Sequence, residues 1–286
     1  MNKLTIPERK IEVDYPSEWD EINASCAEKI GAIMYRAFML EIDYDLARKM
    51  AVDVFINRVN STKKPAYNKE SANYWANEVV LAESVNFLFN KTIKRDRSDS
   101  IEINPKFCTN LVPVVKVGWH KFKGPRDLLS DLTIWQFKEA SWRIGKYALT
   151  KNQQYLDGIF SVLYLKTDER DPEKGERQRQ RIVGKVSQGT KFMAYLFFLG
   201  CMNWIREESI EVDGQEICFG CLFPSAKQST KEKEGIVDDK TGMAGILFQM
   251  AESGVFGNME QTSRVNMWDV FLRLYQIHQQ IKGQKQ

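Results

Sequence analysis

Histidine is the scarcest of the residues that commonly carry chemistry, with only His120 and His278 among 286 residues. The two lie far apart along the chain, so they form no local metal-binding or nucleophile motif. The metalloprotease, nucleophile-elbow, EF-hand and dinucleotide-binding patterns are also missing from the sequence. Residues 184–187 (GKVS) match only part of a phosphate-binding loop, because Arg179 stands where that motif requires its first glycine. We therefore predict a protein that is not an enzyme and that holds no cofactor or metal.

Neither sign of charge dominates the chain, because 41 lysines and arginines are balanced by 38 aspartates and glutamates. The resulting net charge of +3 creates no broad field that would attract nucleic acid or a membrane. The most apolar run covers residues 192–205, and its 14 residues fall short of the about 20 that span a bilayer. We interpret this run as a buried helix, and we expect no membrane contact.

Cysteine is scarce as well, and five cysteines in a chain of this length do not indicate a disulfide framework. The first ten residues lack the apolar core of a secretory signal, so we expect a reducing cytoplasm. Cys218 and Cys221 nevertheless form a CxxC, which suits a redox dithiol or half of a zinc site. A redox CxxC usually opens a helix, whereas this pair ends a predicted hairpin. We interpret both cysteines as structural and buried, and keep an enzyme or redox protein centred on them as an alternative.

What the sequence does contain is mostly helical pattern, interrupted by short extended segments. A strand is expected at residues 10–15, and helices are expected to begin at Ser17 and Ser25 and to cover residues 43–59 and 70–89. Residues 1–90 are thus predicted to be an N-terminal helical region. Residues 91–286 add short strands, a helical core and a C-terminal helix, and we expect the two regions to pack as one compact domain. The predicted fold class is α+β, mainly α.

The extended segments are short and carry turn signals. β-Branched residues alternate at residues 100–104 and 114–119, and the neighbouring prolines Pro105 and Pro113 indicate strands that are short or at a sheet edge. Asp213-Gly214 between two alternating segments predicts an antiparallel hairpin. Residues 167–181 are almost entirely charged, and residues 225–240 are polar, so both are predicted to be loops.

The clearest local pattern lies in residues 130–166. A first helix should begin after the hydroxyl cap Thr133 or Ser130, and the cap residue Asn152 should start a second helix. So short a connection favours an antiparallel pair of helices, an αα-hairpin. The apolar positions expected to face inward are Ile134, Phe137, Ser141, Ile144 and Ala148 in the first helix, and Tyr155, Leu156, Ile159, Val162 and Leu163 in the second.

A second stripe on the first of these helices consists of Trp135, Trp142 and Leu149, which repeat every seven residues. Large aromatic side chains mostly serve burial, so hairpin packing is one interpretation of the two tryptophans. A partner surface anchored by tryptophan is the other interpretation.

The last predicted helix, residues 266–281, has two apolar faces, which favour either deep burial or a partner groove. One face has Met267, Phe271, Leu274, Ile277 and Ile281, and the other has Trp268, Leu272 and Tyr275. With the hairpin, this helix supplies the candidate partner-binding residues, which are Trp135, Trp142, Trp268, Phe271, Leu272 and Tyr275.

Two basic clusters could contact phosphate. They comprise Lys91, Lys94, Arg95 and Arg97, and then Arg177, Arg179, Arg181 and Lys185. We interpret both as solvated loop charges, because nucleic-acid binders usually show a clearer basic footprint. A phage or mobile-element protein that uses Arg177, Arg179 and Arg181 on nucleic acid is kept as an alternative.

Three stretches carry a resemblance to a known set of proteins: residues 11–22 (IEVDYPSEWDEI), residues 134–137 (IWQF) with 155–164 (YLDGIFSVLY), and residues 191–199 (KFMAYLFFL). They resemble tailed-bacteriophage proteins encoded near the tail genes, including tail assembly chaperones. The resemblance implies binding to phage tail or other virion proteins without catalysis, with homo-oligomerisation as a further expectation. It implies a location in the host cytoplasm, with incorporation into the virion as an alternative role.

Overall fold

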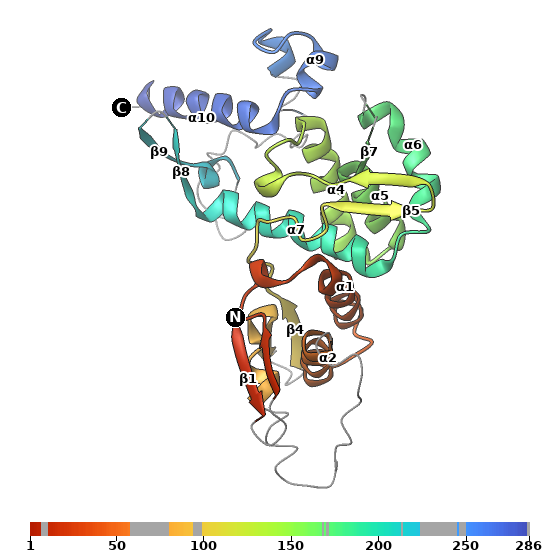
Figure 1. The fold of residues 1–286 in the computed structure, drawn as a ribbon. Coiled ribbons are helices and arrows are strands. Elements are labelled where there is room, and N and C mark those ends of the chain that lie inside the picture. The colour runs from red at the N-terminus through yellow and green to blue at the C-terminus, as the bar shows by residue number, and fades with distance from the viewer. Residues whose placement is uncertain are drawn as a thin grey trace. The chain divides into compact units, whose positions relative to one another are not determined.

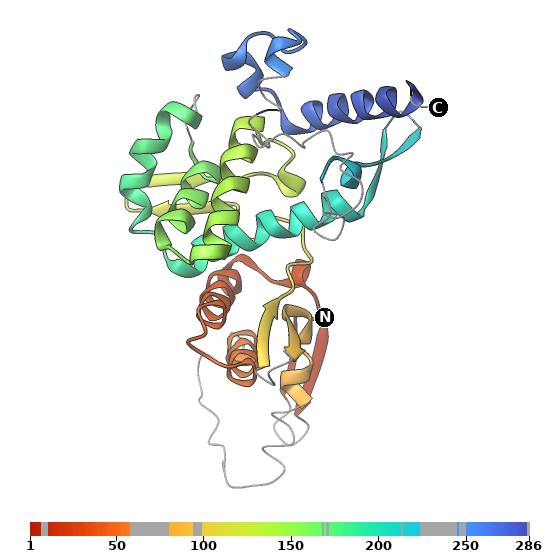
Figure 2. The same ribbon diagram turned by 180° about the vertical axis from the view of Figure 1, so that it is seen from behind.

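The computed structural model describes residues 1–6, 11–57, 80–93, 99–167, 169, 172–212, 214–223, 245 and 250–284. Over these residues the protein is α+β and mainly α, with helices accompanied by small two- and three-stranded sheets, as the sequence predicted (Figures 1 and 2). The chain forms two compact units, residues 1–112 with 185–197 and residues 113–184 with 198–286. The predicted boundary at residue 90 does not coincide with this division, and packing of the whole chain as one domain stays a prediction.

The first unit begins with two antiparallel strands and continues with two helices and a second strand pair. In chain order its elements are β1 (Asn2–Ile6), β2 (Ile11–Tyr15), η2 (Trp19–Glu21), α1 (Ala24–Phe38), α2 (Tyr44–Asn57), η3 (Asn86–Leu88), β3 (Phe89–Ile93) and β4 (Asp99–Ile103). β1 pairs with β2 and β3 with β4. The strand predicted at residues 10–15 is therefore confirmed as β2.

Two helix predictions in this unit are wrong. The start expected at Ser17 is only the short 3-10 turn η2, and the next helix is capped by Asn23, whose side-chain oxygen accepts from the Cys26 N–H at 3.1 Å. The helix predicted over 70–89 does not reach Phe89, which pairs with Ile103 as the first residue of β3. Residues 70–79 of that prediction, and the polar loop predicted at 225–240, lie outside the described part of the chain.

Close backbone contact and aromatic packing hold the core of the first unit. A Cβ atom added to Gly31 of α1 would lie 2.3 Å from the carbonyl oxygen of Gly189, so neither residue has room for a side chain there. One turn further along α1, Tyr35 packs edge-on against Phe192 at 5.8 Å between ring centroids. The apolar run that contains Phe192 lies in α7 (Gln188–Glu207), and most of it is buried, as predicted.

The second unit contains the helical hairpin, a three-stranded sheet and the C-terminal helix. Its elements are β5 (Val114–Val117), β6 (His120–Lys123), η4 (Asp127–Leu129), α4 (Ile134–Thr150), α5 (Gln153–Leu163), β7 (Leu165–Lys166), α6 (Pro172–Val183), the end of α7, β8 (Ser209–Val212), β9 (Gln215–Cys218), η5 (Phe219–Leu222), α9 (Met259–Ser263) and α10 (Met267–Gln284). None of the helices in the described part of the chain is long and apolar enough to cross a membrane.

The strand predictions for this unit are confirmed. β5 has four residues and is the edge strand of the sheet β5-β6-β7, in agreement with the proline beside it. β8 and β9 form the antiparallel hairpin expected around Asp213-Gly214. Gly214 has a φ of 76°, a value that glycine adopts without the steric cost of a side chain, whereas Asp213 lies outside the described residues.

The charged loop predicted at residues 167–181 is wrong, because most of it forms the helix α6. Composition alone suggested that this segment could bury nothing. The helix instead buries two side chains four residues apart, Arg179 and Val183, both fully inaccessible to solvent. One polar partner of Arg179, the Ser161 carbonyl, lies outside the charged stretch, and the other, Glu169, lies ten residues earlier within it.

The beginning of α10 is joined to the beginning of α4. The Ile134 N–H donates to the Val265 carbonyl and the Met267 N–H to the Leu132 carbonyl, each at 2.9 Å. Behind this junction the rings of Phe137 and Phe271 meet edge to face, 5.1 Å between centroids. The two segments that supplied the candidate partner-binding residues therefore share one core.

Candidate interaction surfaces

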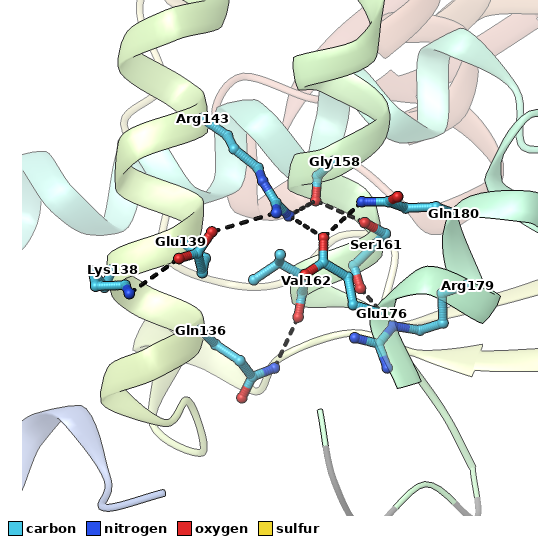
Figure 3. Close-up of polar contacts among 10 residues, drawn as sticks. All are labelled: Gln136, Lys138, Glu139, Arg143, Gly158, Ser161, Val162, Glu176, Arg179 and Gln180. Carbon is cyan, nitrogen blue, oxygen red and sulfur yellow. Dashed lines mark hydrogen bonds and ion pairs between the residues drawn. The ribbon is translucent and has the colours of Figure 1, made fainter. Parts of the chain in front are cut away.

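Gln136 ties the start of α4 to the end of α5. It completes a capping box with Thr133: the Gln136 N–H donates to the Thr133 hydroxyl, and the Thr133 N–H donates to the Gln136 side-chain oxygen, both at 3.2 Å. The amide nitrogen of the same buried side chain donates to the Val162 carbonyl at 2.9 Å (Figure 3). This pairing of the first turn of α4 with the last turn of α5 confirms the antiparallel hairpin.

Arg143 makes the second tie, in the middle of the hairpin. Its guanidinium donates to the Gly158 carbonyl at 3.0 Å and forms an ion pair with Glu176 of α6 at 2.6 Å (Figure 3). A Cβ atom on Gly158 would lie 2.9 Å from the Arg143 side chain, so the glycine leaves room for the arginine. Arg143 thereby connects three helices through one side chain.

Arg179 makes the third tie, between α6 and the second half of α5. Its Nε donates to the Ser161 carbonyl at 2.5 Å, and its guanidinium forms an ion pair with Glu169. A buried arginine that is paired and hydrogen-bonded in this way fixes the position of α6 on α5. Arg179 is consequently not part of a surface patch with Arg177 and Arg181, which remain exposed. The first basic cluster lies mostly outside the described residues, with Lys94, Arg95 and Arg97 in that part.

The stripe of Trp135, Trp142 and Leu149 runs from the core to solvent along α4. The exposed fraction rises from 8% at Trp135 to 53% at Trp142 and 84% at Leu149. Trp142 touches the α5 residue Tyr155 edge to face, with ring centroids 5.7 Å apart, and Tyr155 is itself half-buried rather than buried as predicted. We name Trp142, Leu149 and Tyr155 the outer face of the hairpin.

The inward face of α4 also differs in detail from the prediction. Ile134, Phe137 and Ile144 are buried as expected, whereas Ala148 is exposed and Ser141 is half-buried. Their place in the interior is taken by Gln136, Ala140 and Tyr147. The polar Gln136 was overlooked, although the spacing Thr-x-x-Gln is a sequence signature of the capping box.

The candidate residues of α10 fall into two groups. Phe271 is fully buried, as are Met267, Val270 and Leu274, so this face docks the helix on its own unit. Trp268, Leu272 and Tyr275 are half-buried. The ring of Phe219 from η5 lies 5.7 Å from the Trp268 ring and 6.2 Å from that of Tyr275, so the second face already has an intramolecular partner. Ile281, predicted on the buried face, is exposed.

The CxxC lies where β9 passes into η5, and both cysteines are exposed, so the expectation of buried thiols is wrong. The residues between them explain the spacing structurally. Phe219 is buried, and a Cβ atom on Gly220 would lie 2.4 Å from the Arg206 carbonyl oxygen. Glycine is therefore required where this turn touches the end of α7.

The chemistry of the two thiols does not favour a reactive pair. Desolvation and the neighbouring Cys218 raise the pKa of the Cys221 thiol, which makes its nucleophilic thiolate scarcer at neutral pH. Among the described residues no cluster of three or more histidine, cysteine, aspartate or glutamate side chains is placed to hold a metal ion.

The two histidines lie in different environments. His120 is exposed on β6. His278 is buried on α10, where desolvation, and then the charge of Lys282, lower its pKa. Its Nε2 atom has no hydrogen-bond partner among the described residues.

Comparison of the sequence with protein-family models and with curated proteins, and of the structure with solved structures, finds no match.

Proposed function

We propose that this chain is a non-enzymatic assembly protein that captures a partner protein through the outer face of the α4–α5 hairpin. The observation that carries the proposal is the exposure of Trp142 and Leu149 on a hairpin whose closure relies on other residues. Tryptophan is enriched among the few residues that dominate binding energy at protein interfaces. An exposed pair of large apolar side chains on one helix face is a suitable anchor for such a contact.

Of the candidate residues, Trp142 is the one best placed for a partner. Trp135 and Phe271 belong to the core, and Trp268 and Tyr275 pack on Phe219. Among the described residues Trp142 has one aromatic neighbour, Tyr155, which contacts the indole edge to face and leaves it 53% exposed. The outer face is therefore available without any rearrangement of α10.

The resemblance of three stretches to tail-region proteins of tailed bacteriophages supports the class of partner. We propose a tail or other virion protein, met in the host cytoplasm and escorted as by a tail assembly chaperone. Retention of the chain in the finished particle as a structural component is compatible with the same surface. A second copy of the chain is another occupant that the test must separate from a tail protein.

The test is co-expression of the tagged chain with the product of each adjacent gene, followed by co-purification. The wild-type chain should capture one neighbouring product, and Trp142→Ala with Leu149→Ala should weaken that capture by about 30-fold or more, the loss typical of an interface hot spot. Light scattering of the purified chain alone reports whether a second copy occupies the face instead.

A matched double variant, Trp268→Ala with Tyr275→Ala, locates the surface. If the outer face is the binding site, this variant should capture the partner nearly as well as the wild type. Loss of capture in this variant alone, with a normal unfolding transition, would assign the site to α10. Capture of no adjacent product by the wild-type chain would contradict the proposed function.

A further inference from the structure

The sheet β5-β6-β7 presents an unpaired edge on β5. The strand β5 pairs only with β6 among the described residues, in the register Val115 opposite Phe122 and Val117 opposite His120. The two residues between the strands, Gly118 with a φ of 56° and Trp119, form a two-residue turn. The opposite edge of β6 is occupied by β7.

The register decides which backbone groups of β5 face this edge. The Gly124 N–H donates to the Pro113 carbonyl at 2.9 Å, so residues 113 and 124 form a hydrogen-bonded pair. Hydrogen-bonded and non-hydrogen-bonded pairs alternate along an antiparallel ladder. The pairs of Val114 with Lys123 and of Lys116 with Lys121 are therefore non-hydrogen-bonded pairs. The N–H and C=O groups of Val114 and Lys116 point away from β6.

The same alternation is visible on the far side of β6, which supports the assignment. The Lys121 carbonyl points away from β5 and accepts from the Thr167 N–H at 3.3 Å, next to β7. On β5 no described segment takes the corresponding place, and Val114 is 43% exposed. The outward-facing backbone groups of Val114 and Lys116 can therefore form hydrogen bonds with a further strand.

The side chains beside this edge are basic. Lys116, Lys121 and Lys123 lie on the same face of the sheet as Val114, opposite to the buried Phe122, and all three lysines are exposed. Strands β5, β6 and β7 contain no carboxylate, and no ion pair joins these three lysines to a described acidic residue. A ligand at this edge would meet the positive charges of these three lysines, one on β5 and two on the neighbouring strand β6.

Trp119 lies in the turn at one end of the same edge. Its side chain is fully exposed at the tip of the hairpin, and it is the most exposed large apolar side chain among the described residues. An indole beside an open strand edge offers an apolar contact to the first or last side chain of an added strand.

We propose that the β5 edge binds an acidic extended segment of a partner protein by β-strand addition. Backbone hydrogen bonds to Val114 and Lys116 hold the added strand, its carboxylates face the lysines, and an apolar residue covers Trp119. This ligand uses the unpaired backbone groups as well as the charge and the indole, whereas a nucleic acid would use only the last two. The proposal concerns a surface separate from the outer face of the hairpin and does not depend on it.

The test uses two fluorescein-labelled ten-residue peptides, one alternating glutamate with valine and the other alternating lysine with valine. Fluorescence anisotropy with the full chain should show binding of the acidic peptide and about tenfold weaker or no binding of the basic one. The triple variant Lys116→Glu, Lys121→Glu and Lys123→Glu should reverse this preference. The control Lys146→Glu, an exposed lysine on α4, should leave it unchanged.

A second pair of variants tests the backbone contact with all charges kept. Val114→Pro removes an outward N–H that makes no bond within the sheet, and it should weaken peptide binding about 2- to 10-fold, as expected for one hydrogen bond. Val114→Thr keeps the N–H and should bind as the wild type does. Equal unfolding midpoints of the two variants show that the hairpin itself is intact.

Three results would overturn the proposal. The first is that the acidic peptide fails to bind the wild-type chain. The second is that Val114→Pro and Val114→Thr bind it equally. The third is that an oligothymidylate binds more tightly than the peptide and is indifferent to Val114→Pro, which would make the surface a polyanion site.

Discussion

The inner and outer faces of the α4–α5 hairpin are built from different chemistry. On the inner face, polar side chains reach across to backbone carbonyls: Gln136 to Val162 and Arg143 to Gly158. On the outer face, Trp142 and Leu149 are largely in solvent. A hydrogen bond to a carbonyl fixes one geometry, while an exposed aromatic ring adds little to closure. The hairpin can therefore keep its fold while its aromatic side remains free for a partner.

The largest effect should come from the buried arginine that attaches α6 to this hairpin. We expect Arg179→Ala to lower the free energy of unfolding by about 3–5 kcal/mol, because Glu169 and the Ser161 carbonyl lose their partner. Urea unfolding followed by circular dichroism measures the change. Arg177→Ala, two residues away and exposed, should change it by less than about 0.5 kcal/mol. Equal effects of the two substitutions would contradict the distinction between them.

A smaller loss should follow from removing the tie at the start of α4. We expect Gln136→Ala to cost about 1–3 kcal/mol, since the Val162 carbonyl and the Thr133 N–H are both left without this partner. The control is Gln154→Ala on α5, where the side chain is exposed. If both variants unfold at the same urea concentration, Gln136 does not hold the hairpin.

Substitutions on the outer face should change the free energy of unfolding only slightly. Trp142→Ala is expected to cost about 1 kcal/mol, which corresponds to its edge-to-face contact with Tyr155. Leu149→Ala should stay within about 0.5 kcal/mol. Trp135→Ala, on the same stripe but buried, should cost about 3–5 kcal/mol in the same unfolding experiment. A loss from Trp142→Ala as large as that from Trp135→Ala would make the outer face structural.

The smallest effect concerns the pH dependence of stability and His278, which is buried on α10. Because the folded state lowers the pKa of His278 below its ordinary value of 6.5, the folded protein binds fewer protons there than the unfolded chain. Stability from this group is present above pH 6.5 and is lost as the pH falls towards the folded pKa. The thermal midpoint should fall more between about pH 7.5 and about pH 5.5 for the wild type than for His278→Gln. The same fall in both proteins would assign the dependence to other groups.

Sequence periodicity predicted the hairpin well, because the cap residue Thr133, the short connection and the cap residue Asn152 are local signals. It also predicted β2, β4, β5 and the β8–β9 pair, where alternation and turn residues are local as well. It failed at α6, whose charged sequence is typical of a loop. The ion pair that neutralises Arg179 joins it to Glu169, ten residues earlier, and forms only in the folded chain. It failed at Phe89 because strand pairing with Ile103 outweighs the helical pattern of the preceding residues.

The candidate surfaces show the same limit. A seven-residue repeat identified Trp135, Trp142 and Leu149 as one stripe but could not say how far each lies from the core. Trp119 and the three lysines of β5 and β6 were not singled out, because their common face depends on the register of two strands.

Local sequence signals specify the helices and strands over most of the described chain, because capping, turn chemistry and apolar spacing act within a few residues. Which apolar and charged residues become buried in the interior depends on how the segments pack together. Exposure depends on contacts between segments far apart in the chain, such as Gln136 with Val162 and Arg179 with Ser161. In the folded chain Trp135 and Arg179 are buried, whereas Trp142, Leu149 and the β5 edge lie at the surface.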